Sequence, residues 1–200
     1  MTLRARPPRP SRSRAFDPRR VGRLESRAWE TYYRRKWVAF LTASIGLVRA
    51  AFGMNWARTI VGAWLVLRAN QKWAPFPAND ADAARALMAR FYRLVKVSEG
   101  SDLDPGRAAV LEVEWWRAHR ANQHGEHGEE ELINALRDLY AYTYGADPDH
   151  VREAAALRAE AMDISDRWVG RGCDPSDPLL AHERVLLVRS YASLLAAVHR

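Results

Sequence analysis

The fold is decided by stretches such as DPLLAHERVLLVRSYASLLAAV, residues 177–198, which join a helix-start signal to a helical apolar stripe. Asp177 is a typical N-cap, and Pro178 suits the first helical position because the N–H that it lacks would have no helical partner there. The apolar residues that follow recur every three or four positions, which is the period of a helix with one buried face. They are Leu180, Leu187, Val188, Tyr191, Leu195 and Val198.

The same Asp-Pro pair stands at Asp104 and at Asp147, and no stretch alternates with the period of a strand. Turn residues fall at helix-length intervals, which favours helices throughout. The sequence therefore predicts an all-α protein: a single helical-bundle domain of about seven helices over residues 24–200. The expected helices span about residues 22–52, 55–72, 79–100, 104–123, 129–144, 147–170 and 177–200.

The positive charge is concentrated at the N-terminus. Residues 1–23 hold eight arginines against one acid, Asp17, whereas residues 24–200 hold equal numbers of acidic and basic residues. Prolines and repelling charges predict a disordered Arg/Pro-rich tail over residues 1–23. A neutral core lacks a large basic groove, which makes nucleic acid an unlikely partner for it. The tail is either a solubilising extension or an electrostatic tether to a polyanion, such as an anionic membrane surface.

The longest apolar run, Trp37 to Val48, ends at Arg49, and Arg58 interrupts the next one. Both runs fall short of the ~20 residues that a membrane-spanning helix needs. The sequence therefore predicts buried hairpin helices, packed closely through Gly46, Gly53 and Gly62. The alternative is peripheral membrane contact, for which the arginines of the tail would supply a second binding signal.

Several polar or amphipathic residues fall on or beside helix faces that are otherwise apolar, and they are the candidate pocket residues. Charged groups are rarely buried without a partner, so the acids of this set are expected to pair with its bases inside the bundle. The alternative is that these side chains stand at the edges of their stripes and reach water. The set comprises Glu25, Tyr32, Lys36, Glu112, Trp116, His119, Asp166 and Arg184.

No motif of a known chemistry is present. Di-metal sites in helical bundles use Glu-x-x-His, which the chain lacks, so we expect no metal site. The chain also lacks a glycine-rich phosphate loop, and Cys173 is its only cysteine. The eight tryptophans are expected mainly in the core, although tryptophan also lines ligand pockets.

Three function classes remain open. The first is a ligand- or protein-binding module, with an unknown small molecule or protein as partner and the basic tail as tether. The second is a cofactor- or metal-dependent oxidoreductase with Glu25, Tyr32, Glu112 and His119 in an interior pocket. The third is a peripheral membrane protein that acts through residues 37–67. The preference for arginine over lysine is typical of a bacterial protein from a GC-rich genome, and we expect a cytoplasmic protein or one held at a membrane surface.

Overall fold

The computed structural model describes residues 14–126 and 128–200, and the regular structure in these ranges is entirely helical. This confirms the all-α prediction. The helices are α1 (Pro18–Tyr33), α2 (Trp37–Phe52), α3 (Trp56–Trp73), α4 (Ala81–Glu99), α5 (Pro105–Gln123), α6 (Glu129–Tyr144), α7 (Pro148–Gly170) and α8 (Pro178–Ala197).

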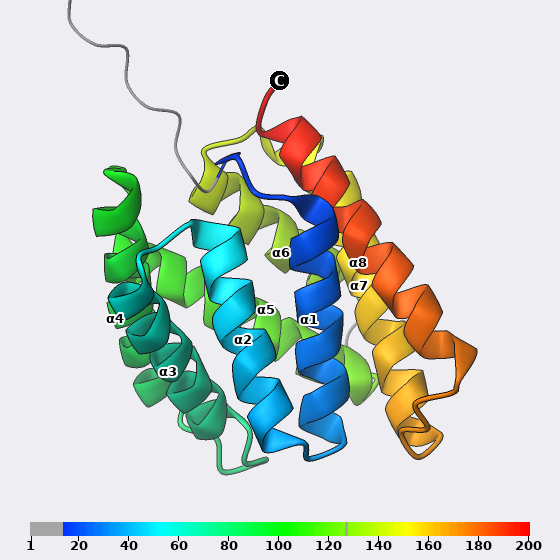
Figure 1. Cartoon of the computed structure of the whole chain (residues 1–200). Coiled ribbons are helices and arrows are strands. Elements are labelled where there is room, and N and C mark those ends of the chain that lie inside the picture. The colour runs from blue at the N-terminus through cyan, green and yellow to red at the C-terminus, as the bar shows by residue number, and fades with distance from the viewer. Residues whose placement is uncertain (1–13, 127) are drawn as a thin grey trace, which may run out of the picture.

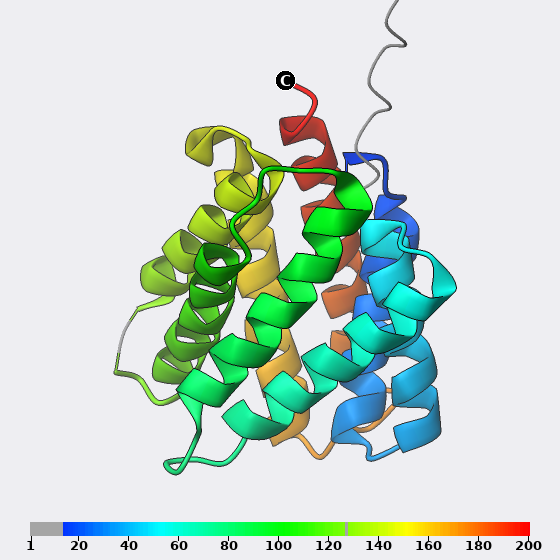
Figure 2. The same ribbon diagram turned by 90° about the vertical axis from the view of Figure 1, so that its left-hand side faces the viewer.

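The helices form a closed bundle. Each helix packs against the next one in the chain, and α8 returns to pack against α1 (Figure 1). Figure 2 looks onto α3 and α4, which lie side by side along one flank of the bundle. Many residues of α2 and α3 are exposed, so the other described helices do not enclose these two.

The Asp-Pro signals work as predicted. The carboxylates of Asp104, Asp147 and Asp177 each accept a backbone N–H from the first turn of their helix. A fourth pair, Asp17-Pro18, starts α1 in the same way, so residues 18–23 belong to the folded bundle and not to the predicted tail. Residues 1–13 of that tail lie outside the described residues.

The predicted first helix, residues 22–52, is two helices. The chain turns at Arg35, whose φ of 57° is left-handed. The N–H of Arg35 bonds to Tyr32 O and that of Lys36 to Thr31 O, which is the hydrogen-bond pattern of a Schellman helix end. Glycine usually takes this position, and its absence left the break without a sequence signal. An unbroken helix of this length would extend roughly 45 Å at ~1.5 Å per residue and would overrun the bundle.

Two large clusters of buried apolar side chains fill the bundle. One lies mainly among α6, α7 and α8, and the other mainly among α3, α4 and α5. α1 and α8 approach each other closely at Gly22, where a Cβ atom would lie 2.8 Å from Val188 N. This close packing positions the polar side chains of α1 against those of α8.

Candidate functional site

A buried ion pair links α1 to α7. The carboxylate of Glu25 accepts hydrogen bonds from Arg158 Nη2 at 2.6 Å and from the Tyr191 hydroxyl at 2.6 Å. The side chains of Glu25 and Arg158 are only 4% and 13% exposed. The sequence predicted Arg184, Lys36 or His119 as the partner of Glu25, so this part of the prediction is wrong.

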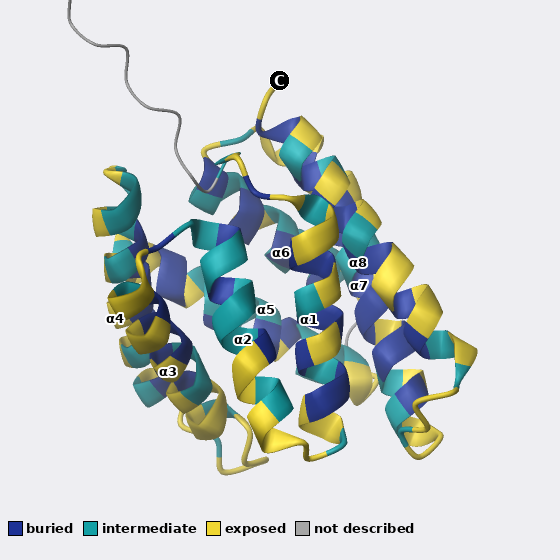
Figure 3. Ribbon diagram, viewed as in Figure 1, coloured by how far each residue is buried: buried dark blue, intermediate teal, exposed yellow. Residues whose placement is uncertain are grey.

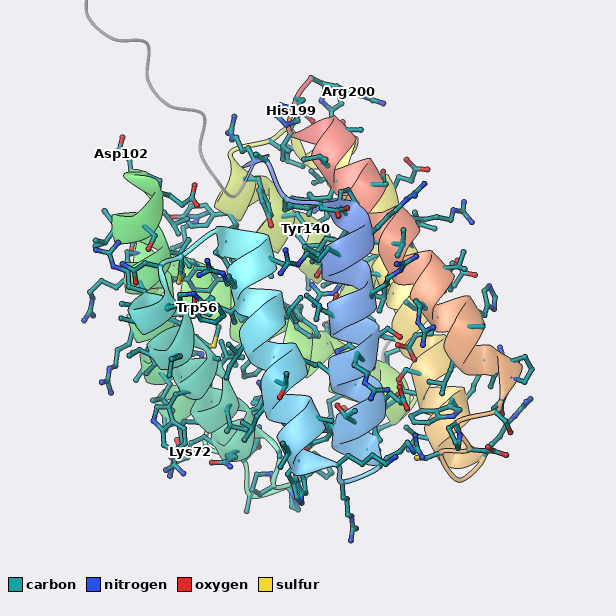
Figure 4. All side chains as sticks on the ribbon, viewed as in Figure 1. Trp56, Lys72, Asp102, Tyr140, His199 and Arg200 are labelled. Carbon is teal, nitrogen blue, oxygen red and sulfur yellow. The ribbon has the colours of Figure 1, made fainter. Side chains whose placement is uncertain are left out.

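Arg158 holds further groups around the pair. Its Nη1 donates to the Tyr140 hydroxyl at 3.2 Å, and its guanidinium stands 5.0 Å from the ring centre of Trp115. Burial lowers the pKa of Arg158, but its interactions with Glu25, Tyr140, Tyr191 and Glu112 together outweigh burial and hold that pKa well above the usual range. In Figure 4 Tyr140 is seen in the gap between the ribbons of α1 and α2, with α6 behind them. The Glu25 network thus joins α1, α6, α7 and α8.

Glu112 lies in α5 and pairs with a hydroxyl, not with a base. It accepts a hydrogen bond from Tyr92 at 2.6 Å. Burial raises the pKa of Glu112, and the Tyr92 hydrogen bond partly offsets that rise. Trp116 is buried next to it in α5 and packs against Trp73.

Asp166 does contact the predicted partner His119. The His119 Nε2 and Asp166 Oδ2 atoms are 3.0 Å apart, and Gln123 donates to Asp166 Oδ1 at 2.8 Å. Both side chains of the pair are partly exposed. Asp166 follows Arg158 by eight residues, or ~12 Å along α7, so this pair lies apart from the Glu25 network.

The remaining predicted site residues face water. Tyr32 is 39% exposed, and Lys36 and Arg184 are also exposed. The prediction that Arg184 is the buried base of α8 is wrong, because the neighbouring Glu183 faces the interior instead.

Glu183 is fully buried, and neither of its carboxylate oxygens has a hydrogen-bond partner within the described residues. Burial raises its pKa to about 8, against a lowering effect of the nearby Ser26. No group of three or more His, Cys, Asp or Glu side chains in the described part of the chain could hold a metal.

The largest departure from the sequence prediction concerns α2 and α3. They were expected to be buried, but many of their residues are exposed (Figure 3), and the exposed residues include large apolar ones. Val38 is 81% exposed, and Trp56 is 60% exposed. We call these residues the α2–α3 face: Trp37, Val38, Leu41, Trp56, Ile60, Val61 and Trp64.

Two tryptophans of this face make cation–π contacts with arginines. The guanidinium carbon of Arg49 lies 4.2 Å from the ring centre of Trp56, and that of Arg68 lies 5.9 Å from the ring of Trp64. Figure 4 shows Trp56 near one end of α3 and Lys72 near the other.

Charge is segregated along the chain as well. Between Glu30 and Asp80 there is no acidic residue. The same segment holds seven basic residues, namely Arg34, Arg35, Lys36, Arg49, Arg58, Arg68 and Lys72. The neutral total for residues 24–200 therefore conceals a positive α2–α3 segment and a negative remainder.

A groove lies next to this face, between α1 and α2. Its volume is about 780 Å³, and Arg19, Arg20 and Arg23 of α1 line it. These three arginines precede residue 24, so they lie outside the neutral core of residues 24–200 for which no large basic groove was expected.

Among the described residues no single helix is long and apolar enough to cross a membrane. Only α2 and α3 taken together reach that length and composition, and the chain bends by 117° between them.

In comparisons with family models, with curated proteins and with solved structures, the chain matches none.

Proposed function

We propose that this protein is a binding module whose partner is an anionic phospholipid membrane, and that it attaches to the membrane surface through the α2–α3 face. The observation that carries this proposal is the coincidence of exposed apolar side chains and exclusively basic charges in one segment, residues 31–79. A helix that lies in a membrane interface has this combination of an apolar side and flanking Lys or Arg.

The apolar side chains of the face favour lipid over water. Single exposed apolar residues are ordinary, but seven large ones on two consecutive helices favour an interaction surface. Three of the seven are tryptophan, which prefers the headgroup level of a bilayer because its ring is amphipathic. These side chains are between 43% and 81% exposed, so the transfer of each into lipid contributes ~1 kcal/mol.

The basic residues of the segment favour a lipid surface over a second copy of the chain as the partner. A second copy of the chain would bring its own acid-free segment against the first, and like charges would oppose that contact. An anionic bilayer attracts each Lys or Arg near its surface by ~1 kcal/mol. The proposal therefore favours a lipid surface over self-association through this face.

The N-terminal sequence adds to the attraction. Residues 1–13 contain Arg4, Arg6, Arg9 and Arg12 and no acid. A single weak binding element gives only reversible attachment to a membrane, whereas two elements together give stable anchoring. Here the two elements would be the α2–α3 face and the basic N-terminal residues. Because anionic lipids are abundant in the leaflet that faces the cytoplasm, the proposal implies a cytoplasmic protein held at the membrane.

Vesicle flotation tests the proposal. We expect the full chain to float with vesicles that contain phosphatidylglycerol and to stay behind with purely zwitterionic vesicles. The double variant Val38→Glu/Trp64→Glu should lose flotation, because it places two charges in the face. The matched control is Val185→Glu, which alters a 54% exposed valine of α8 and should still float.

Two results would contradict the proposal. One is equal flotation of the double variant and the control. The other is a dimer in analytical ultracentrifugation that the double variant converts to a monomer, with no flotation of either form. The second result would assign the face to protein association.

A further inference from the structure

We propose that the groove between α1 and α2 binds the phosphate of a single membrane phospholipid, with preference for a phosphomonoester headgroup. This inference rests on the proposed function, since it names a lipid that the membrane-attached protein would recognise. The groove has about 780 Å³, within the ~300–1,000 Å³ range of small-molecule sites.

One wall of the groove is cationic. Arg19, Arg20 and Arg23 come from the first two turns of α1, where spacings of three and four residues place side chains on one side of a helix. All three are exposed, and no ion pair among the described residues engages their guanidinium groups. A planar guanidinium donates two parallel hydrogen bonds to phosphate oxygens, which favours arginine over lysine for this ligand.

The one acid of the groove does not cancel this wall. Asp17 lines the groove at the start of α1, and its Oδ1 accepts the backbone N–H of Arg19 as the helix cap. A single carboxylate therefore faces three guanidinium groups. A phosphomonoester carries up to two negative charges near neutral pH and three strong acceptor oxygens, which matches the remaining charge.

Another wall of the groove is mainly apolar. Leu24 of α1 lines it with Thr42, Ile45 and Gly46 of α2, and a Cβ atom on Gly46 would lie 3.1 Å from a methyl group of Leu24. This wall leads toward the α2–α3 face, because Trp56 lines the groove and also belongs to that face. A ligand that joins a phosphate to an acyl chain fits such lining better than a free phosphate ion.

The test compares lipids at equal surface charge. Vesicles of phosphatidic acid and of phosphatidylglycerol are matched in total negative charge, and the affinity of the full chain is measured for each. The wild type should prefer phosphatidic acid by roughly tenfold, because its phosphomonoester offers the arginines a second negative charge and one more strong acceptor oxygen. The variant Arg20→Gln/Arg23→Gln should bind both vesicles equally.

The variant Arg90→Gln/Arg93→Gln is the matched control, because it removes two exposed arginines with the same spacing from α4. It should keep the preference while losing the same net charge. A preference that survives in Arg20→Gln/Arg23→Gln, or that is absent from the wild type, would overturn the inference. Binding of the wild type to neither vesicle would instead overturn the proposed function.

A second arm separates lipid from free phosphate. Calorimetric titration with short-chain, water-soluble phosphatidic acid should show binding that Arg20→Gln/Arg23→Gln abolishes. Inorganic phosphate should bind at least tenfold more weakly, because it cannot contact the apolar wall. Equal affinity for inorganic phosphate would overturn the assignment to a lipid.

Discussion

Arg158→Met tests whether the Glu25 network holds the bundle together. Methionine keeps much of the length and apolar stem of the arginine side chain but removes its charge. Glu25 would then stay buried with Tyr191 as its remaining hydrogen-bond donor. The substitution also removes the hydrogen bond to Tyr140.

The expected cost follows from burial. Breaking a buried ion pair by removal of one partner costs ~3–5 kcal/mol, because the other charge is left uncompensated. The side chains of Glu25 and Arg158 are only 4% and 13% exposed, so screening by water reduces the cost of breaking the pair only slightly. For a chain of this length the loss corresponds to a drop in Tm of roughly 10 °C.

Equilibrium urea unfolding at neutral pH measures the effect. The double variant Glu25→Gln/Arg158→Met removes both charges. Its loss in the free energy of unfolding should therefore be smaller than the sum of the losses of Glu25→Gln and Arg158→Met alone. Arg184→Met is the control and should alter the free energy of unfolding by less than ~0.5 kcal/mol, because Arg184 is exposed. The reasoning fails if Arg158→Met costs no more than this control, or if the two single losses add in the double variant.

Three further outcomes are expected from urea unfolding. Burial raises the pKa of Glu183 to about 8 in the folded protein, whereas a glutamate in the unfolded chain has a pKa of ~4.3. Between these two pH values the folded state binds more protons than the unfolded state. The free energy of unfolding therefore falls as the pH rises through this range. The stability of Glu183→Gln relative to the wild type should therefore rise by ~3–4 kcal/mol between pH 5 and pH 8, and a pH-independent difference would contradict this. Gly22→Ala should cost ~1–3 kcal/mol because its Cβ would meet the Val188 backbone, whereas Gly170→Ala, with open space around it, should be nearly neutral; equal effects would refute the close approach of α1 and α8. Asp147→Ala should cost ~1 kcal/mol through loss of its N-cap bond, and an unchanged midpoint would show that the cap contributes nothing.

The helix boundaries were the most predictable feature, because their signals are local. An aspartate cap followed by proline acts within one turn, so the starts of α5, α7 and α8 could be read directly. The same signal at Asp17-Pro18 could have extended the folded part to α1. The break at Arg35 had no such signal, because an arginine occupies a position that glycine usually takes.

The candidate site was less predictable, because a helical wheel gives the face of a residue but not its partner. Glu25 was correctly expected to be buried, yet its partner Arg158 comes from another helix 133 positions away. A signal for Arg158 did exist, since it lies between Ala155 and Met162 along α7, and both of these residues are buried.

The exposure of α2 and α3 could not be read from the sequence. An apolar helix has the same composition whether neighbouring helices or a lipid surface cover it. Only the three-dimensional structure shows that the apolar side chains of the α2–α3 face stay exposed. The absence of acids between Glu30 and Asp80, in contrast, was available from the start.

Fluorescence quenching by lipids with brominated acyl chains tests membrane attachment most directly. Quenching requires contact between an indole ring and the acyl region, and Trp37, Trp56 and Trp64 are the tryptophans of the α2–α3 face. We expect anionic brominated vesicles to quench the wild type, and to leave a variant with phenylalanine at these three positions unquenched. Quenching of the variant to the same extent, or an unquenched wild type on vesicles to which it is bound, would contradict attachment through this face.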